Sequence, residues 1–225
     1  MTLPPVSVHS STHLSLSGGH HSLLDDSTSF QRLAALLRVS SQQQLDFPSL
    51  HTLVKSRLEA LFPAHPEAFL RSEHAEEALA LSVKYDIPSI SKPLYYTVAT
   101  HPHEHESLEE GAQTLATHPR LSPELTARCD ALLESLVAQF TPVLFTVATA
   151  GHMACTDVFA EKWMPLVIQP ALDGNGLCRP LETLEWIIAI DWAAEGVCAE
   201  CVKAKTEEWR GEQRGLWEKM DAWLE

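Results

Sequence analysis

The sequence has few basic residues and lacks any stretch typical of a membrane helix. A membrane span needs about 20 nearly uninterrupted apolar residues. The most apolar window, 132–150, contains Glu134, Gln139 and Pro142, which predicts a buried segment instead. The first residues carry neither a basic nor a long apolar stretch, so we expect no secretory signal. With 16 Lys and Arg against 30 Asp and Glu, the formal net charge is -14. Such a surface repels phosphate backbones, so we expect no nucleic-acid partner.

Cysteine is also scarce, and the common enzyme motifs are missing. The 5 cysteines are an odd number without a secretory signal, which predicts reduced thiols in a cytoplasmic or nuclear protein. The sequence contains no glycine-rich phosphate loop, no nucleophile elbow and no His-Glu-x-x-His motif. These absences favour a protein that is not an enzyme.

The pattern that is present is helical, so we expect a mainly α fold in two parts. Residues 1–28 are rich in Ser and His and are predicted to form a disordered tail. Residues 29–100 are predicted to form a short helical bundle, because apolar residues recur three and four positions apart. An acidic, His-rich linker is expected at 101–120, followed by a second helical domain at 121–225.

Prolines and capping residues predict where several helices begin. Pro88 is expected to break the chain before a helix that Ser91 caps, with Pro93 in its first turn. Ser122 followed by Pro and Glu is typical of a helix start. The β-branched run at 143–147 fits either a strand or the approach to another helix. Thr156 is expected to cap the helix that follows.

Tryptophan is concentrated in the second part. All six tryptophans lie beyond residue 160, so we expect this part to have a dense core of its own. The last helix, from about 200 to 224, repeats an apolar residue every seven positions. That face is expected to pack within the chain or against a partner helix, and its members are Val202, Trp209, Leu216 and Trp223.

Two short motifs carry the chemistry of this sequence. His152-x-x-Cys155 and Cys198-x-x-Cys201 offer one imidazole and three thiolates, each pair preceding a predicted helix. Zinc in structural sites takes four such ligands in a tetrahedron. We therefore predict a structural zinc knuckle formed by these four residues.

Other interpretations of these residues remain open at this point. The cysteines could be buried core thiols, Cys198 and Cys201 could be a redox pair, or Cys178 could replace one ligand. The enzymatic alternative uses an open zinc site, or Cys155 as nucleophile with His152 as base. Asp157 or Asp191 would then orient the imidazole. Cys129 lies among leucines at helical spacing and is expected in the core. His101, His103 and His105 alternate within the linker, where a solvated hinge is favoured over metal binding.

Residues 78–96, with the sequence ALALSVKYDIPSISKPLYY, resemble the helices that close a BTB/POZ domain in large families of mushroom-forming fungi. The runs at 152–157, 163–166, 180–184 and 198–201, with Glu-Trp-Arg at 208–210, resemble the C-terminal region of those fungal proteins. The strand-rich first half of a BTB domain is missing, which suggests a truncated relative. The resemblance implies homodimerisation and adaptor duty in cullin ubiquitin ligases or transcriptional complexes.

Together these observations predict a non-enzymatic, mainly α interaction module or adaptor with a structural zinc ion. Its expected partner is another protein or a second copy of the chain. The alternative is the small enzyme described above.

Overall fold

The computed structural model describes residues 28–62, 74–101 and 121–225, and in these ranges it is helical without a strand. The predicted mainly α fold is thus confirmed. Most of the predicted tail and linker lies outside the described residues. The elements in chain order are α1 (Phe30–Ser40), α2 (Pro48–Leu61), α3 (Ala75–Lys84), α4 (Pro88–Thr100), α5 (Pro123–Phe145), α6 (Met153–Trp163), the π-helix η1 (Met164–Ile168), α7 (Gln169–Asp173), the 3-10 helix η2 (Gly176–Cys178), α8 (Pro180–Ala189) and α9 (Ala199–Leu224). None of the described helices combines the length and the apolar character needed to span a membrane.

The helix start predicted at Ser122 is confirmed, but the prolines inside the helices gave wrong expectations. The Ser122 Oγ accepts a hydrogen bond from the Leu125 N–H at 3.3 Å, as an N-cap residue does. Pro88 does not stand outside the fourth helix. It is the first residue of α4, where its missing N–H costs nothing, and Pro93 lies in the helix interior. Likewise α5 continues through Pro142 to Phe145, so the run at 143–147 is mostly helix and not a strand.

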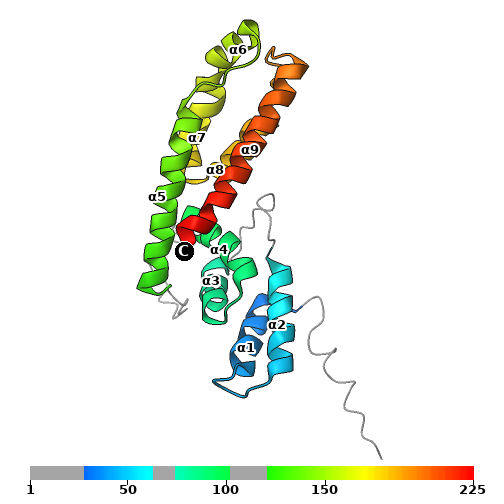
Figure 1. Cartoon of the computed structure of the whole chain (residues 1–225), viewed down its shortest axis with the longest axis vertical. Helices are drawn as coiled ribbons and strands as arrows, with labels where there is room; N and C mark the ends of the chain where they lie inside the picture. Colours follow the sequence, from blue (N-terminus) through cyan, green and yellow to red (C-terminus); the bar gives the residue numbers. More distant parts are fainter. Residues whose placement is uncertain (1–27, 63–73, 102–120) are drawn as a thin grey trace, which may run out of the picture.

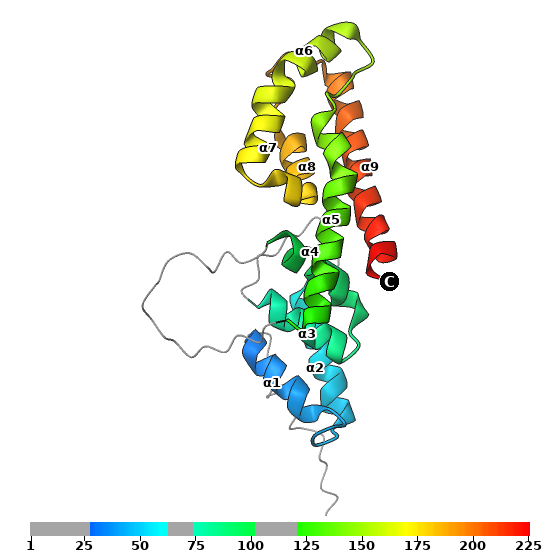
Figure 2. The same cartoon turned by 90° about the vertical axis from the view of Figure 1, so that its left-hand side faces the viewer.

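The long helices α5 and α9 lie side by side in opposite directions and form the frame of the second half (Figures 1 and 2). Helix α9 contacts both α5 and α8. Its buried residues are Cys201, Lys205, Trp209, Gln213, Leu216 and Met220. Of the predicted heptad face, Trp209 and Leu216 are buried, and Val202 and Trp223 are partly buried against the core, so much of this face packs within the chain.

Helix α4 joins the two halves of the molecule. It packs against α3 on one side and against α5 and α9 on the other. Lys92 pairs with Asp221 on α9 at 2.8 Å and lies over the Trp217 ring at 4.8 Å. The buried residues of both predicted parts form one continuous hydrophobic cluster.

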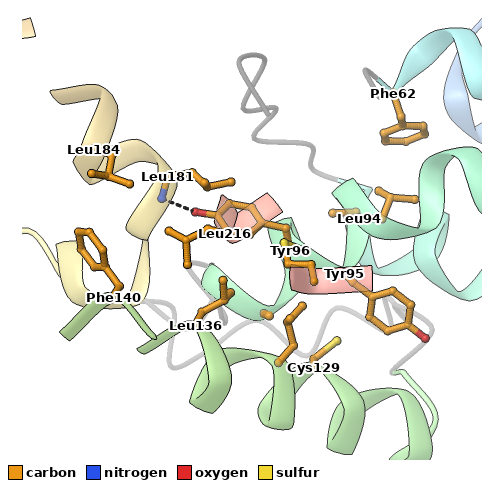
Figure 3. Packing of buried hydrophobic residues seen from close by; sticks show 14 of the residues in the cluster. Phe62, Leu94, Tyr95, Tyr96, Cys129, Leu136, Phe140, Leu181, Leu184 and Leu216 are labelled. Atoms are coloured by element: carbon orange, nitrogen blue, oxygen red, sulfur yellow. Dashed lines mark hydrogen bonds between the residues drawn. The ribbon is translucent and has the colours of Figure 1, made fainter. Parts of the chain in front are cut away.

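Tyr96 forms a buried polar contact at this junction. Its hydroxyl accepts a hydrogen bond from the Leu181 N–H at 3.1 Å (Figure 3). It also donates one to Glu182. Burial raises the pKa of Tyr96 well above its usual value, so the hydroxyl stays protonated and donates. The neighbouring Tyr95 ring points the other way (Figure 3). Its hydroxyl is buried without a hydrogen bond of normal geometry, and the Arg128 guanidinium lies 5.6 Å from the ring centroid.

These adjacent tyrosines give a matched pair of variants. Tyr96→Phe removes the acceptor of a buried amide, so we expect it to lower the free energy of unfolding by about 1–3 kcal/mol. Tyr95→Phe removes a hydroxyl without a hydrogen bond of normal geometry and should be neutral or slightly stabilising. Urea unfolding of both variants measures the difference. An equal loss in both would show that the contact to Leu181 and Glu182 contributes nothing.

Candidate metal site

The four predicted ligands occupy equivalent positions on two helix starts. His152 is the N-cap residue of α6 and Cys198 is the N-cap residue of α9. Cys155 is the third residue of α6, and Cys201 is the third residue of α9. Side chains at the N-cap and third helical positions lie over the same open end of a helix. Each motif thus presents two donors from the first turn, and both first turns lie at the end of the molecule opposite α1 and α2 (Figure 1).

The donor atoms of these residues converge on one point. The His152 Nδ1 atom lies 3.8 Å from the Cys155 Sγ and 3.6 Å from the Sγ atoms of both Cys198 and Cys201. All four donor atoms lie within 4.8 Å of one another. One imidazole nitrogen and three sulfurs at these separations could bind a single metal ion.

Hydrogen bonds favour an ionised sulfur at Cys198, whereas burial and the neighbouring thiols raise the pKa of Cys201. Cys155 and Cys201 are buried, Cys198 is partly exposed and His152 is exposed. The Cys198 N–H donates a hydrogen bond to the Cys155 Sγ at 3.5 Å. Hydrogen bonds from the Cys201 backbone N–H and the Cys201 thiol lower the pKa of the Cys198 thiol to about 7. The partial positive charge at both helix N-termini acts in the same direction.

Thr156 holds the turn that precedes α6, although the sequence predicted it as the helix cap. The helix begins three residues earlier, at Met153. The Thr156 Oγ1 accepts a hydrogen bond from the Ala150 N–H at 3.0 Å and lies 3.2 Å from the His152 carbonyl, to which it donates. It thereby fixes the backbone on both sides of Gly151. The N-cap position of His152 carries no side-chain cap, so no sequence signal marked it.

A second turn positions the other pair. Asp191 accepts a hydrogen bond from the Ala194 N–H at 3.1 Å, and the Val197 N–H donates to the Trp192 carbonyl at 2.9 Å. Gly196 has φ 107°, a conformation that favours glycine, and it brings the chain round to Cys198. The Asp191 carboxylate thus shapes this turn, whereas the enzymatic alternative assigned it to the imidazole.

The expected dense tryptophan core lies about two helical turns beyond the four ligands along α6 and α9. Trp163, Trp192 and Trp209 are buried, and their ring centroids lie 6.0–6.2 Å apart. Phe159, one turn after Cys155 on α6, packs against Trp192 at 4.9 Å. The Trp163 Nε1 donates to the Leu144 carbonyl at the end of α5, at 2.9 Å. These contacts join the second half of α6 to Trp192, in the turn before α9, and to Trp209 within α9.

The remaining candidate residues lie elsewhere. Cys129 is buried on α5, as expected, and burial raises the pKa of its thiol to about 11. Cys178 lies in η2 and is not in the four-residue cluster. The His101 Nε2 lies 3.9 Å from a carboxylate oxygen of Glu182, whereas His103 and His105 fall outside the described residues.

We compared the chain with protein-family models, curated proteins and solved structures, and found no match in any of the three comparisons.

Proposed function

We propose that the chain is a non-enzymatic protein-interaction module whose second half is held by a structural zinc ion. The ion would bind His152, Cys155, Cys198 and Cys201. The observation that carries the proposal is the convergence of these four donor atoms within 4.8 Å from two separate helix starts.

The donor set and its spacing favour zinc. With Zn–S bonds of about 2.3 Å and Zn–N bonds of about 2.0–2.1 Å, tetrahedral geometry puts nitrogen and sulfur donors about 3.6 Å apart. The Nδ1–Sγ separations of 3.6–3.8 Å match that value. A two-iron cluster would spread its ligands over two metal atoms, which fits this compact set less well. The zinc content of the purified chain, measured by elemental analysis, tests the assignment, and we expect one zinc ion per chain.

A structural role fits the site better than a catalytic one. A catalytic zinc keeps one coordination position open for water, whereas this chain offers four protein donors to one point. Cys155, the nucleophile of the enzymatic alternative, is only 4 % exposed, and its Sγ faces the His152 ring and the Cys198 amide. A thiol in that position is poorly placed to attack a substrate.

The turn between α1 and α2 supports the interaction role. Leu45 and Phe47 are 59 % and 53 % exposed, and Val39 beside them is 46 % exposed. Backbone hydrogen bonds hold the turn in a fixed shape, from Leu45 to Val39 at 3.2 Å and from Phe47 to Ser40 at 3.1 Å. Apolar side chains held rigidly in solvent are typical of a surface that a protein partner covers.

The double variant Leu45→Asp, Phe47→Asp tests this surface. We expect it to abolish capture of a partner protein from cells, or self-association measured by light scattering. Stability should change by less than about 1 kcal/mol because both side chains are exposed. Gln43→Asp is the matched control, because it adds an acid to the same turn and keeps both apolar residues. Identical partners and oligomeric state in all three proteins would contradict a role for this turn.

A further inference from the structure

Among the four ligands, one thiol differs from the others in its access to solvent. Cys198 is partly exposed at the start of α9, whereas Cys155 and Cys201 are 4 % and 5 % exposed. Cys198 is therefore the cysteine of the site most accessible to a dissolved oxidant. The sulfurs available to react with an oxidised Cys198 are those of Cys155 and Cys201, because all lie within 4.8 Å of one another.

The helix geometry favours Cys201 as the reaction partner. Cys198 and Cys201 belong to the first turn of α9, at the N-cap and the third helical position. Residues three apart on a helical turn have Cα atoms about 5 Å apart, inside the range of 4.4–6.8 Å that disulfides span. Pairing of these two needs only side-chain rotation. Pairing with Cys155 would instead cross from α9 to α6, which the tryptophan core holds at a fixed spacing.

We propose that the site is a redox-released zinc centre, in which hydrogen peroxide converts Cys198 and Cys201 to a disulfide and expels the ion. This inference rests on the zinc assignment made above. With two of the four donors joined to each other, only His152 and Cys155 remain, and two donors are too few for a structural zinc site. The ion that ties the start of α6 to the start of α9 is thereby lost, while the tryptophan contacts between these elements stay.

The chemistry balances in two steps. The Cys198 thiolate sulfur attacks one oxygen of hydrogen peroxide, forming an S–O bond and breaking the O–O bond, and hydroxide leaves. The Cys201 thiolate then attacks the Cys198 sulfur of this sulfenic acid, forming the S–S bond, and a second hydroxide leaves. Two protons from solvent convert both hydroxides to water. The cysteine pair has lost two electrons and the peroxide has gained them.

The test uses the full chain with its metal, whose zinc content is first measured by elemental analysis. Hydrogen peroxide is then added, and a colorimetric chelator detects released zinc. We expect release of the whole zinc content and recovery of binding after a dithiol reductant and zinc are supplied. Cys178→Ser, which alters a thiol outside the cluster, should release its zinc at the same rate.

Tryptic mapping identifies the disulfide, because cleavage after Arg128, Lys162 and Lys203 places Cys155 on a different peptide from Cys198 and Cys201. Cys198 and Cys201 remain on one peptide, 163–203, whereas Cys155 lies on 129–162. In Cys178→Ser, a disulfide confined to 163–203 must join Cys198 to Cys201. A cross-link between the two peptides, or zinc release with only sulfinic acid at Cys198, would overturn the inference. Zinc retained under peroxide would overturn it and leave the zinc assignment intact, whereas protein purified without zinc would contradict both.

Discussion

Replacing Cys201 with serine is expected to abolish zinc binding and lower the melting temperature by about 8–16 °C. A ligand present at 1,000 times its dissociation constant stabilises the folded state by about 4 kcal/mol. Each kcal/mol corresponds to about 2–4 °C in a chain of this size. Cys201 is a strong choice because it is buried and its Sγ lies 3.6 Å from the His152 Nδ1. Elemental analysis and thermal unfolding followed by circular dichroism measure the two effects.

Cys178→Ser is the matched control for this variant. Cys178 is a partly exposed thiol in the same half of the chain, but it lies outside the four-residue cluster. We expect the zinc content to stay at one ion per chain and the melting temperature to change little. Removing zinc from the unmodified chain with a chelator should reproduce the shift seen for Cys201→Ser. If Cys201→Ser kept its zinc, the ligand assignment would be wrong.

The second large effect is expected for Trp163→Ala, which should destabilise the chain by about 3–5 kcal/mol, the usual cost of truncating a buried aromatic side chain. Trp163 is 2 % exposed and stacks on Trp192 and Trp209. Its indole N–H also donates a hydrogen bond to the Leu144 carbonyl of α5. Its loss opens a cavity in the tryptophan core and leaves that carbonyl without its indole donor. Urea unfolding followed by circular dichroism measures the loss.

Trp186→Ala separates this effect from the general loss of a tryptophan. Trp186 lies on α8 and is 36 % exposed, so its removal should cost no more than about 1 kcal/mol. Because the tryptophan core holds α6 beside α9, Trp163→Ala should also weaken zinc binding, whereas Trp186→Ala should leave it unchanged. Equal stabilities of the two variants would show that the stacked cluster is not the centre of this half.

The site was more predictable from the sequence than the elements that carry it. The spacing of His152 with Cys155 and of Cys198 with Cys201 identified four residues whose donor atoms the fold brings together. Each pair of ligands is only three positions apart, so the predicted ligand set does not depend on where the helices begin or end. The position of Thr156 was wrong because a residue with capping chemistry can equally serve inside the first turn, where its hydroxyl binds the preceding loop.

Long-range contacts were the part that the sequence could not supply. Local pattern gave no sign that Tyr96 would meet Leu181 and Glu182, which lie more than 80 positions away. The predictions made from prolines were wrong for a different reason. Pro142 and Pro93 lie inside helices because tertiary packing of α5 and α4 outweighs the local cost of a missing N–H. The BTB-like resemblance and the adaptor role stay predictions.

The separation of the two ligand pairs along the chain has a consequence for the order of assembly. Residues 156–197 lie between the two pairs. An ion that bound all four ligands in the unfolded chain would have to close this long loop, which costs chain entropy. The stacked rings of Trp163, Trp192 and Trp209 close that loop with apolar contacts alone. Zinc should therefore enter a chain that has already folded, and exchange with the surrounding metal pool without global unfolding.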